Sequence, residues 1–190
     1  MQQPSPKFYL GGGSGQAWEL SAKHSDVHLF WGDTYAQIAS NMAAIRELAA
    51  KHGRADAIDF GMRLQIICRE TEDEAWSAAR QLVEGVSEKH QQMIKTHFVT
   101  SVANQRMQKL GEQDLIEPHL WTGLTKVRPG AGVAVVGNPS QVAGVLQNFI
   151  DIGCSSFCLS GYLHDEEAER FGRWVRPLLV ERNRGRMKAA

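Results

Sequence analysis

Short apolar runs alternate along this chain with longer segments in which apolar residues recur at helical spacing. Four runs predict β-strands, at residues 8–10, 27–31, 58–68 and 156–160. A helical pattern follows each of them, and this alternation of strand and helix predicts a parallel sheet. The sequence therefore predicts an α/β fold built from four βα units.

Capping residues indicate where several of the helices begin. Asp33 or Thr34 stands at the start of the second helix as an N-cap. Thr71 and Glu74 have the spacing of a capping box at the start of the third helix. Asn138 is an N-cap followed by a proline, a combination typical of a helix start. The helices therefore carry start signals of their own.

The last predicted helix covers residues 165–179, and an apolar stripe along it is expected to face the sheet. The stripe consists of Ala168, Phe171, Val175 and Leu178. Residues 181–190 form a basic tail that we expect to be a solvated, frayed end. We interpret residues 1–180 as a single domain.

Residues 85–120 form a polar, helix-prone segment rich in Gln, Lys and His. This segment is much longer than the usual βα connection of about two to six residues. Insertions of this kind on barrels are usually lids or binding loops. We therefore expect a long helical insertion after the third strand.

Each predicted strand ends in a polar or glycine-rich tip. The tips lie at residues 9–15, 28–33, 61–67 and 157–162. In repeated βα units the chemistry is found where strands run into loops, because the strands are rigid and the loops are free to vary. A (β/α)₈ barrel needs eight such units and about 250 residues. The pattern of four units predicts half of a barrel enzyme.

Composition and charge argue against several classes of function. The chain has 190 residues, 43% of them hydrophobic, and a formal net charge of zero, so neither a nucleic-acid partner nor an anionic membrane surface is expected. No apolar stretch approaches the roughly 20 residues of a membrane span. The start lacks the pattern of a secretory signal. We expect the three cysteines, Cys68, Cys154 and Cys158, to be small buried side chains that form no disulfide. This is typical of a reducing compartment, so we expect a cytoplasmic protein.

Arg63 and Gln65 are the most informative polar residues, because they alternate with apolar residues in the third strand. Met62, Leu64 and Ile66 share one face of that strand, and the two polar side chains share the other. In a barrel the apolar set would face the helices, so Arg63 and Gln65 would point inward. The alternatives are an edge strand with a solvated face, or a structural pair between the arginine and a carboxylate.

Arg128 lies in a Gly/Pro-rich stretch, residues 124–132, just past the insertion. A loop arginine is usually solvated, but this one could close over an anion as the loop orders. Residues 11–15 are glycine-rich and precede a helix, which suits backbone N–H groups that approach a phosphate. They match neither the P-loop nor the dinucleotide-binding pattern.

Trp31, Tyr162 and His164 lie at strand ends, where they either pack or contact a planar ligand. Outside these segments we find no Ser/His/Asp set, no His-Glu-x-x-His motif and no Cys-x-x-Cys motif, so no metal site is expected.

Taken together, these segments resemble the C-terminal half of the bacterial-luciferase-like FMN-dependent monooxygenases, and most of all the alkanesulfonate monooxygenases. The matching stretches are Tyr-Leu-Gly-Gly-Gly-Ser (9–14), Trp-Gly-Asp (31–33), Phe-Gly-Met-Arg-Leu (60–64), Arg-Glu-Thr-Glu-Asp-Glu-Ala-Trp (69–76), Leu-Trp-Thr-Gly (120–123), Val-Arg-Pro-Gly-Ala-Gly (127–132) and Leu-Ser-Gly-Tyr-Leu-His (159–164). Their order and spacing hold from about residue 7 to 180.

The resemblance implies half of a luciferase-like TIM barrel that takes reduced FMN from a separate flavin reductase. It implies that O₂ adds to the flavin and that a sulfonate is cleaved to aldehyde and sulfite. The residues that it assigns to FMN phosphate are Gly12, Gly13 and Ser14. The residues that it places in the active site are Trp31, Arg63, Arg128, Tyr162 and His164. The two arginines would bind the sulfonate. The insertion would be the lid over the site.

Three positions depart from the family pattern. Gln65 replaces a histidine and cannot transfer protons near neutral pH, Pro129 replaces a glycine beside the loop arginine, and Leu163 replaces a proline. The first four βα units of the family have no counterpart here. We therefore expect the chain to pair with itself as a homo-oligomer, to need a complementing N-terminal half, or to be a fragment of a longer product.

Three readings of function stay open at this stage. The first is an FMN-dependent monooxygenase of the alkanesulfonate type, present as its C-terminal half. The second is a non-catalytic half-barrel fragment or interaction module. The third is a relative that uses the deazaflavin F420.

Overall fold

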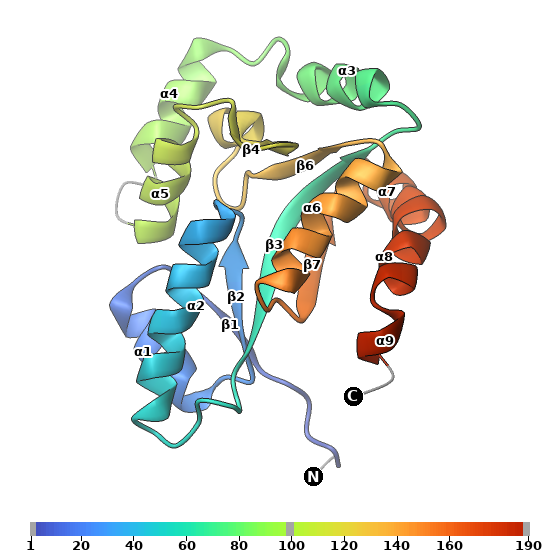
Figure 1. Ribbon diagram of the computed structural model, residues 1–190. Helices are drawn as coiled ribbons and strands as arrows, with labels where there is room; N and C mark the ends of the chain where they lie inside the picture. The colour runs from blue at the N-terminus through green and yellow to red at the C-terminus, as the bar shows by residue number, and fades with distance from the viewer. Residues whose placement is uncertain (1–2, 98–100, 188–190) are drawn as a thin grey trace.

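The computed structural model describes residues 3–97 and 101–187. Four parallel strands curve through the centre of the molecule (Figure 1). They are β1 (Tyr9–Gly11), β2 (Val27–Trp31), β3 (Asp59–Cys68) and β7 (Ser156–Ser160). β2 pairs with β1 and β3, and β7 pairs with β3. The four predicted strands are confirmed, in chain order across the sheet, as in half of a luciferase-like barrel.

Helices follow these strands as predicted. They are α1 (Gly15–His24), α2 (Tyr35–Ala50), α3 (Glu72–Val83) and α7 (His164–Arg170), and α6 (Pro139–Asp151) precedes β7. Of the two candidate caps for α2, Thr34 is the N-cap and accepts a hydrogen bond from the Gln37 N–H. The predicted capping box at Thr71 and the predicted N-cap at Asn138 are both present, and Asn138 also forms a capping box with Gln141. The local start signals are therefore used as expected.

One buried strand was missed by the sequence analysis. β6 (Ala134–Gly137) pairs in parallel with Gln65–Cys68 of β3, beyond the point at which β2 pairs with it. It follows the Gly/Pro-rich stretch, which we had interpreted as loop. Gly132 lies so close to the backbone of Thr125 that a Cβ there would meet its nitrogen at 2.8 Å. The glycines of this stretch therefore permit close packing.

The insertion is helical, as predicted, and it returns into the sheet. Its elements are α4 (Glu88–His97), α5 (Val102–Leu110), β4 (Leu115–Glu117), β5 (Leu120–Trp121) and a 3₁₀ turn, η1 (Gly123–Lys126). β5 pairs antiparallel with β6 and with β4. Figure 1 places α4 and α5 beyond the C-terminal ends of the strands. The insertion therefore stands over the end of the sheet where we expect the chemistry.

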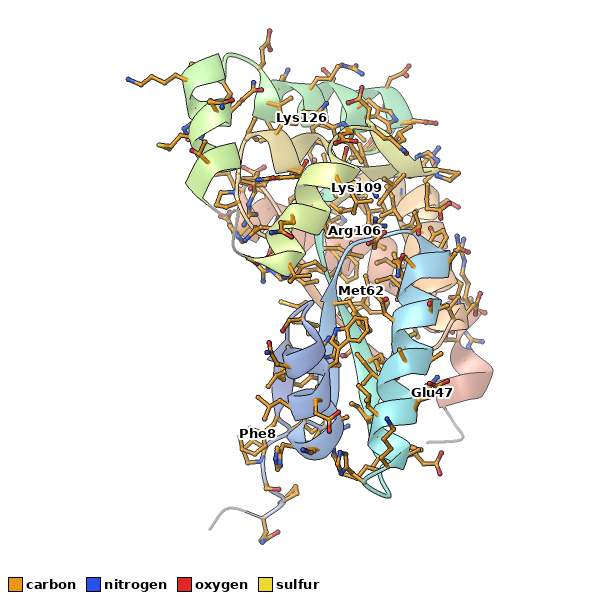
Figure 2. All side chains as sticks on the ribbon, turned by 90° about the vertical axis from the view of Figure 1, so that its left-hand side faces the viewer. Phe8, Glu47, Met62, Arg106, Lys109 and Lys126 are labelled. Carbon is orange, nitrogen blue, oxygen red and sulfur yellow. The ribbon has the colours of Figure 1, made fainter. Side chains whose placement is uncertain are left out.

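The main core lies between the sheet and the helices packed along it. Met62, Leu64 and Ile66 are buried there against α2 and α6, which confirms the predicted orientation of β3. Figure 2 shows Met62 inside the molecule and Phe8 at its exposed edge. The α2 residues that complete this core include Ile38, Met42 and Ile45.

The apolar stripe predicted for the last helix is wrong in part. Val175 is buried, but Ala168 and Leu178 are exposed, and Glu167 is buried instead. The helix is interrupted by a π-helical segment, η2 (Phe171–Val175), before α8 (Arg176–Arg182). A π turn adds a residue, so a stripe extrapolated at 3.6 residues per turn drifts off the buried face.

Glu167 is buried because charged and backbone groups surround it. It forms ion pairs with Arg69 and Arg170 and accepts a hydrogen bond from the Cys68 N–H at 3.1 Å. Burial raises the pKa of the Cys68 thiol to about 11, and the negative charge of Glu167 acts in the same direction. This cluster ties α7 to the end of β3.

The segment predicted as a basic tail is helical as far as the structure describes it. α8 runs through residue 180, and α9 (Arg184–Met187) follows. Between them Asn183 exchanges hydrogen bonds with Gln147 of α6, at 2.7 and 3.2 Å. Residues 188–190 lie outside the described part.

The two outer strands of the four-stranded array each have one open edge in the described structure. β1 pairs only with β2, and β7 pairs only with β3. Phe8, just before β1, and Tyr9, its first residue, are 66% and 53% exposed, and all of β7 is only half-buried. Of the described helices, none combines the length and the apolar character that crossing a membrane requires.

Candidate functional site

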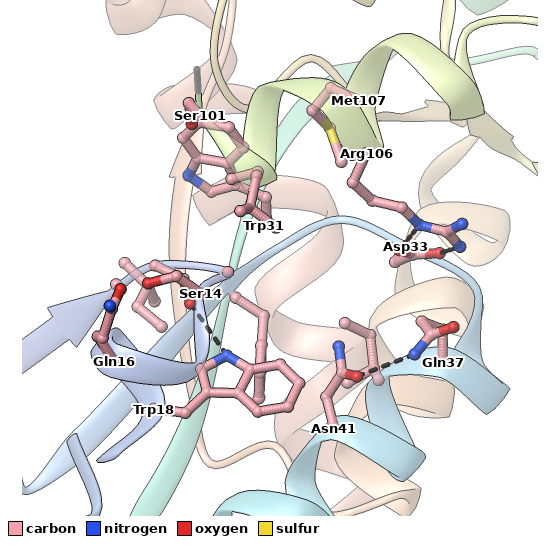
Figure 3. A pocket seen from close by; sticks show the side chains of 18 residues that line it. Ser14, Gln16, Trp18, Trp31, Asp33, Gln37, Asn41, Ser101, Arg106 and Met107 are labelled. Atoms are coloured by element: carbon pink, nitrogen blue, oxygen red, sulfur yellow. Dashed lines mark hydrogen bonds and ion pairs between the residues drawn. The ribbon is translucent and has the colours of Figure 1, made fainter. Parts of the chain in front are cut away.

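A cavity of about 910 Å³ opens at the C-terminal ends of β1 and β2. Its walls come from the glycine-rich loop, β2, α1, α2 and the insertion helix α5 (Figure 3). The polar and aromatic side chains that line it are Ser14, Gln16, Trp18, Trp31, Asp33, Gln37, Asn41, Ser101 and Arg106. A volume of this size is in the range of sites for cofactors and drug-sized ligands.

The pairing register brings Trp31, Arg63 and Cys158 side by side across three strands. Side chains at matched positions of parallel strands point to the same face, which is opposite to the buried core. Arg63 donates from Nη1 to Cys158 Sγ at 3.3 Å. In the described part of the chain Arg63 has no carboxylate partner, and β3 is a central strand. β3 is therefore not an edge strand, and no structural pair of Arg63 with a carboxylate is present among the described residues.

Gln65 lies on the same face and is only 1% exposed. Its Nε2 donates to the carbonyl oxygen of Ala131 at 3.3 Å. Ala131 belongs to residues 128–132, which we call the Arg128 loop. Gln65 therefore holds the Arg128 loop against β3.

Two further contacts hold the Arg128 loop. The N–H of Gly130 donates to Asn104 Oδ1 of α5 at 3.0 Å. A Cβ at Gly130 would lie 4.0 Å from the Trp31 ring. The φ of Gly130 is +85°, which favours glycine. The Arg128 loop therefore lies against β2, β3 and the insertion, with Pro129 at its exposed tip.

Arg128 itself reaches the tip that follows β7. Its Nη1 donates to the Tyr162 hydroxyl oxygen at 3.1 Å. The ring of His164 lies 6.4 Å from that of Tyr162, at the start of α7. The predicted active-site residues thus form two groups, Trp31 with Arg63 and Arg128 with Tyr162, and the Arg128 loop links them.

The glycine-rich loop forms one wall of the cavity and leads into α1. Gly12 has φ +148°, where a side chain is strained, and a Cβ there would meet that of Ala17 at 2.6 Å. Ser14 is the N-cap and accepts from the Ala17 N–H. The first turn of α1 has no acidic residue. Free N–H groups, the helix dipole and a serine hydroxyl suit a phosphate.

The insertion helix α5 covers this loop. A Cβ at Gly13 would lie 3.5 Å from the Ala103 nitrogen. Arg106 donates to both oxygens of Asp33, at 2.6 and 2.7 Å, as Figure 3 shows. The hydrogen bond to Asp33 raises the pKa of Arg106. α5 is therefore fastened to the end of β2 by a bidentate ion pair.

The sequence analysis missed Asn104 and Arg106 as parts of the site. Asp33 had been noted only as a possible N-cap, and its role as the partner of Arg106 had no sequence signal. The two residues are 73 positions apart, and a polar helix gives no indication of which side chain faces inward. In the described residues no group of three His, Cys, Asp or Glu side chains could hold a metal ion.

A separate buried histidine lies on the helix-facing side of β2. His28 is fully buried, and its Nδ1 lies 3.0 Å from Ser21 Oγ, while its Nε2 has no hydrogen-bond partner in the described structure. Burial lowers the pKa of His28 to about 4. The ring is therefore neutral near pH 7, and it does not line the cavity.

Comparison with known sequences gives one family match. The sequence pattern of the luciferase-like monooxygenases matches residues 1–156. This match covers most of the chain, including β1, β2, β3 and the insertion.

Solved structures with the same fold agree. A riboflavin lyase, crystallised with modified FMN and riboflavin, superposes with a TM-score of 0.72 at 20% identity over 94% of this chain and 44% of its own. DmoA from Hyphomicrobium sulfonivorans superposes with a TM-score of 0.74 at 18% identity, over 94% of this chain and 42% of its own. The coenzyme F420-dependent tetrahydromethanopterin reductase from Methanopyrus kandleri superposes with a TM-score of 0.55 at 17% identity, over 91% of this chain and 51% of its own. At these identities the likeness establishes the fold, and the chain spans about half of each neighbour or less.

Proposed function

The chain belongs to the luciferase-like monooxygenase family, and from that premise we propose that it is the C-terminal half of a flavin-dependent monooxygenase that acts on a sulfonate. The observation that carries the proposal is the anchored Arg128 loop. Gln65 and Asn104 hold this loop so that Arg128 and Tyr162 stand at the same end of the sheet as Trp31 and Arg63.

Reduced FMN is the cofactor that we propose, and a separate flavin reductase would supply it. Gly12, Gly13 and Ser14 would hold its phosphate, because this loop has free N–H groups, a hydroxyl and no neighbouring acidic side chain in the helix turn. When bound, the reduced flavin supplies the activation of O₂. Trp31 presents an aromatic surface to the cavity, and α5, which lines it, would limit the access of water once the other half of the site is in place.

Two guanidinium groups would bind the anionic substrate. Arg128 already donates to the Tyr162 hydroxyl oxygen, so the hydroxyl proton stays available for a second hydrogen bond. Within the described residues Arg63 donates to a sulfur atom alone, a weak partner that an anionic oxygen can displace. A sulfonate has three oxygens and suits two arginines and a hydroxyl.

Gln65 stands where the resemblance places a histidine. Its amide does not take up a proton near neutral pH, and its Nε2 is engaged with Ala131. We propose that Gln65 positions the Arg128 loop and that proton transfer falls to Tyr162 or His164. On this view a Gln65→His variant changes the pH dependence of turnover more than the affinity for the sulfonate.

A binding and turnover experiment tests the proposal. The full chain would be titrated with reduced FMN under anaerobic conditions, alone and with a separately produced N-terminal half-barrel of the family. Sulfite release from a series of alkanesulfonates would then be measured with a flavin reductase and O₂. We expect flavin binding and sulfite release with the complementing half, and we expect Arg63→Ala and Arg128→Ala to lower sulfite release by about tenfold or more while flavin binding is kept. Failure to bind flavin in either arrangement would refute the proposal.

The open edges of β1 and β7 favour a second candidate, a non-catalytic half-barrel that works by association. Its partner would be a second copy or a complementing half. Analytical ultracentrifugation separates the candidates, since a dimer that binds no flavin supports the second. The fold also occurs in an F420-dependent enzyme, so F420 belongs in the same titrations. Its tighter binding than that of FMN would replace the cofactor that we propose.

A further inference from the structure

The cavity extends past the glycine-rich loop into the space between α1 and α2. β1 ends at Gly11, which is paired with Leu29, so the β1-side edge of β2 is open at Phe30 and Trp31. Phe30 and Trp31 both line the cavity, although neighbouring residues of a strand point to opposite faces. The cavity therefore passes around the end of β1 and reaches the outer, helical side of the sheet.

Trp18 of α1 forms one wall of this outer end. Its Nε1 donates to the Gly12 carbonyl oxygen at 3.1 Å, and the side chain is half-buried. Figure 3 shows the indole beside the labelled Asn41, with Ser14 at the loop above it. The hydrogen bond fixes the ring relative to the glycine-rich loop. A fixed indole face is a platform on which a planar heterocycle can stack.

Gln37 and Asn41 of α2 form the opposite wall. They are four residues apart on one face of the helix, and Gln37 Nε2 donates to Asn41 Oδ1 at 2.9 Å. The hydrogen bond lies between the two amides (Figure 3), so the Gln37 Oε1 acceptor and the Asn41 Nδ2 donor point away from each other, and Asn41 keeps its Nδ2 donor beside the second lone pair of its Oδ1. A helix face turned toward a neighbouring helix is normally apolar, so a polar pair there suits a polar ligand. The Asn41 amide, oriented by Gln37, has the chemistry to accept a hydrogen bond from the amino group of adenine and to donate one to the adjacent ring nitrogen.

We propose that this outer end is a nucleotide subsite, in which Trp18, Gln37 and Asn41 bind an adenine base whose phosphate lies at Gly12–Ser14. The proposal rests on the phosphate position of the proposed function. It implies that the cavity accepts the adenosine half of FAD as well as FMN. A volume of about 910 Å³ is at the upper end of the range for cofactor sites.

The test isolates the base from the phosphate. Isothermal titration calorimetry on the full chain would compare AMP with ribose 5-phosphate, which has the same phosphate and sugar but no base. We expect AMP to bind at least tenfold more tightly, because stacking and the amide contacts act on the base alone. Equal affinities for AMP and ribose 5-phosphate would overturn the subsite. It would also be overturned if neither ligand bound.

Matched variants locate the effect. Asn41→Ala is expected to lower the AMP affinity about tenfold and to leave that of ribose 5-phosphate unchanged. Trp18→Phe keeps an aromatic ring for stacking, so its AMP affinity is expected to fall less than that of Asn41→Ala. Ser40→Ala, at the exposed neighbour of Asn41, is the control and should bind like the parent chain. A loss for Asn41→Ala that is equal for both ligands would mean a structural role and would overturn the assignment.

The same titrations separate this proposal from the flavin function. If FMN binds and AMP shows no advantage over ribose 5-phosphate, the subsite is wrong and the monooxygenase proposal stands. If AMP shows its advantage and no flavin binds, the subsite stands and the cofactor assignment fails. With both intact, FAD should bind more tightly than FMN, and Asn41→Ala should remove that difference.

Discussion

The two faces of β3 differ in how their side chains are satisfied. On the helix-facing side Met62, Leu64 and Ile66 are fully buried in one apolar cluster. On the inward side Arg63 and Gln65 reach a sulfur atom of β7 and a carbonyl of the Arg128 loop. The first face stabilises the fold by burial, which needs no particular partner atom. The second depends on a few directional contacts from distant segments, and it is the face that carries the candidate chemistry.

The largest effect that separates the two faces is expected from neighbouring substitutions in β3. Leu64→Ala removes a fully buried side chain and should lower the free energy of unfolding by about 2–5 kcal/mol. Arg63→Ala removes only a weak contact to sulfur and should cost less than about 1 kcal/mol. Urea unfolding measures both. Similar losses for the two variants would mean that the faces do not divide stability from function in this way.

His28 is the exception on the helix-facing side, and it predicts a pH dependence. Its folded-state pKa of about 4 lies below the value near 6.5 of an unfolded chain. As pH falls from about 6.5 to 4, the unfolded state therefore takes up a proton that the folded state does not. Stability should fall over this window by about 3 kcal/mol, and none of this loss should occur above it.

The variant His28→Asn tests this dependence. It should unfold with a shallower pH slope between 6.5 and 4, in denaturant titrations at fixed ionic strength. The carboxylates that titrate in the same window are common to both proteins and cancel in the difference. An unchanged slope would show that the ring does not remain neutral in the folded state.

A smaller effect concerns the attachment of α5 over the inward side. Asp33→Asn weakens the bidentate pair with Arg106, and we expect a loss of about 1.5 kcal/mol, since Asp33 is buried but Arg106 is partly exposed. Hydrogen exchange should accelerate in α5 more than in α2. The control is Asp114→Asn, because the pair of Asp114 with Lys126 is exposed and should contribute less than about 1 kcal/mol.

A smaller effect on stability than that of Asp33→Asn is expected at Gln65. Gln65→Ala removes the hydrogen bond to Ala131 and should cost about 1 kcal/mol. Its main consequence should be in the Arg128 loop, where exchange of the Gly130 amide should become faster. If that amide stays equally protected, the hydrogen bond from Asn104 alone holds the loop.

Local patterns were enough to predict most of the fold. The alternation in β3, the capping boxes at Thr71 and Asn138, and the cap of α2 at Thr34 depend on residues within a few positions of one another. Two of the failures also have a local cause. β6 is only four residues long and follows glycines, and the π turn at Phe171–Val175 shifts the helical period without a sequence signal.

The sequence by itself determined the order of strands and helices, the common face of Arg63 and Gln65 on β3, and the position of the glycine-rich loop at the start of a helix. Only the tertiary structure decided which residues meet. The ion pair of Asp33 with Arg106, the contact of Asn104 with Gly130, and the wall of Trp18 facing Asn41 each join segments far apart in the chain. The physical reason is that strand period and capping are set by neighbouring residues. A contact between loops depends instead on the packing of the whole sheet and its insertion.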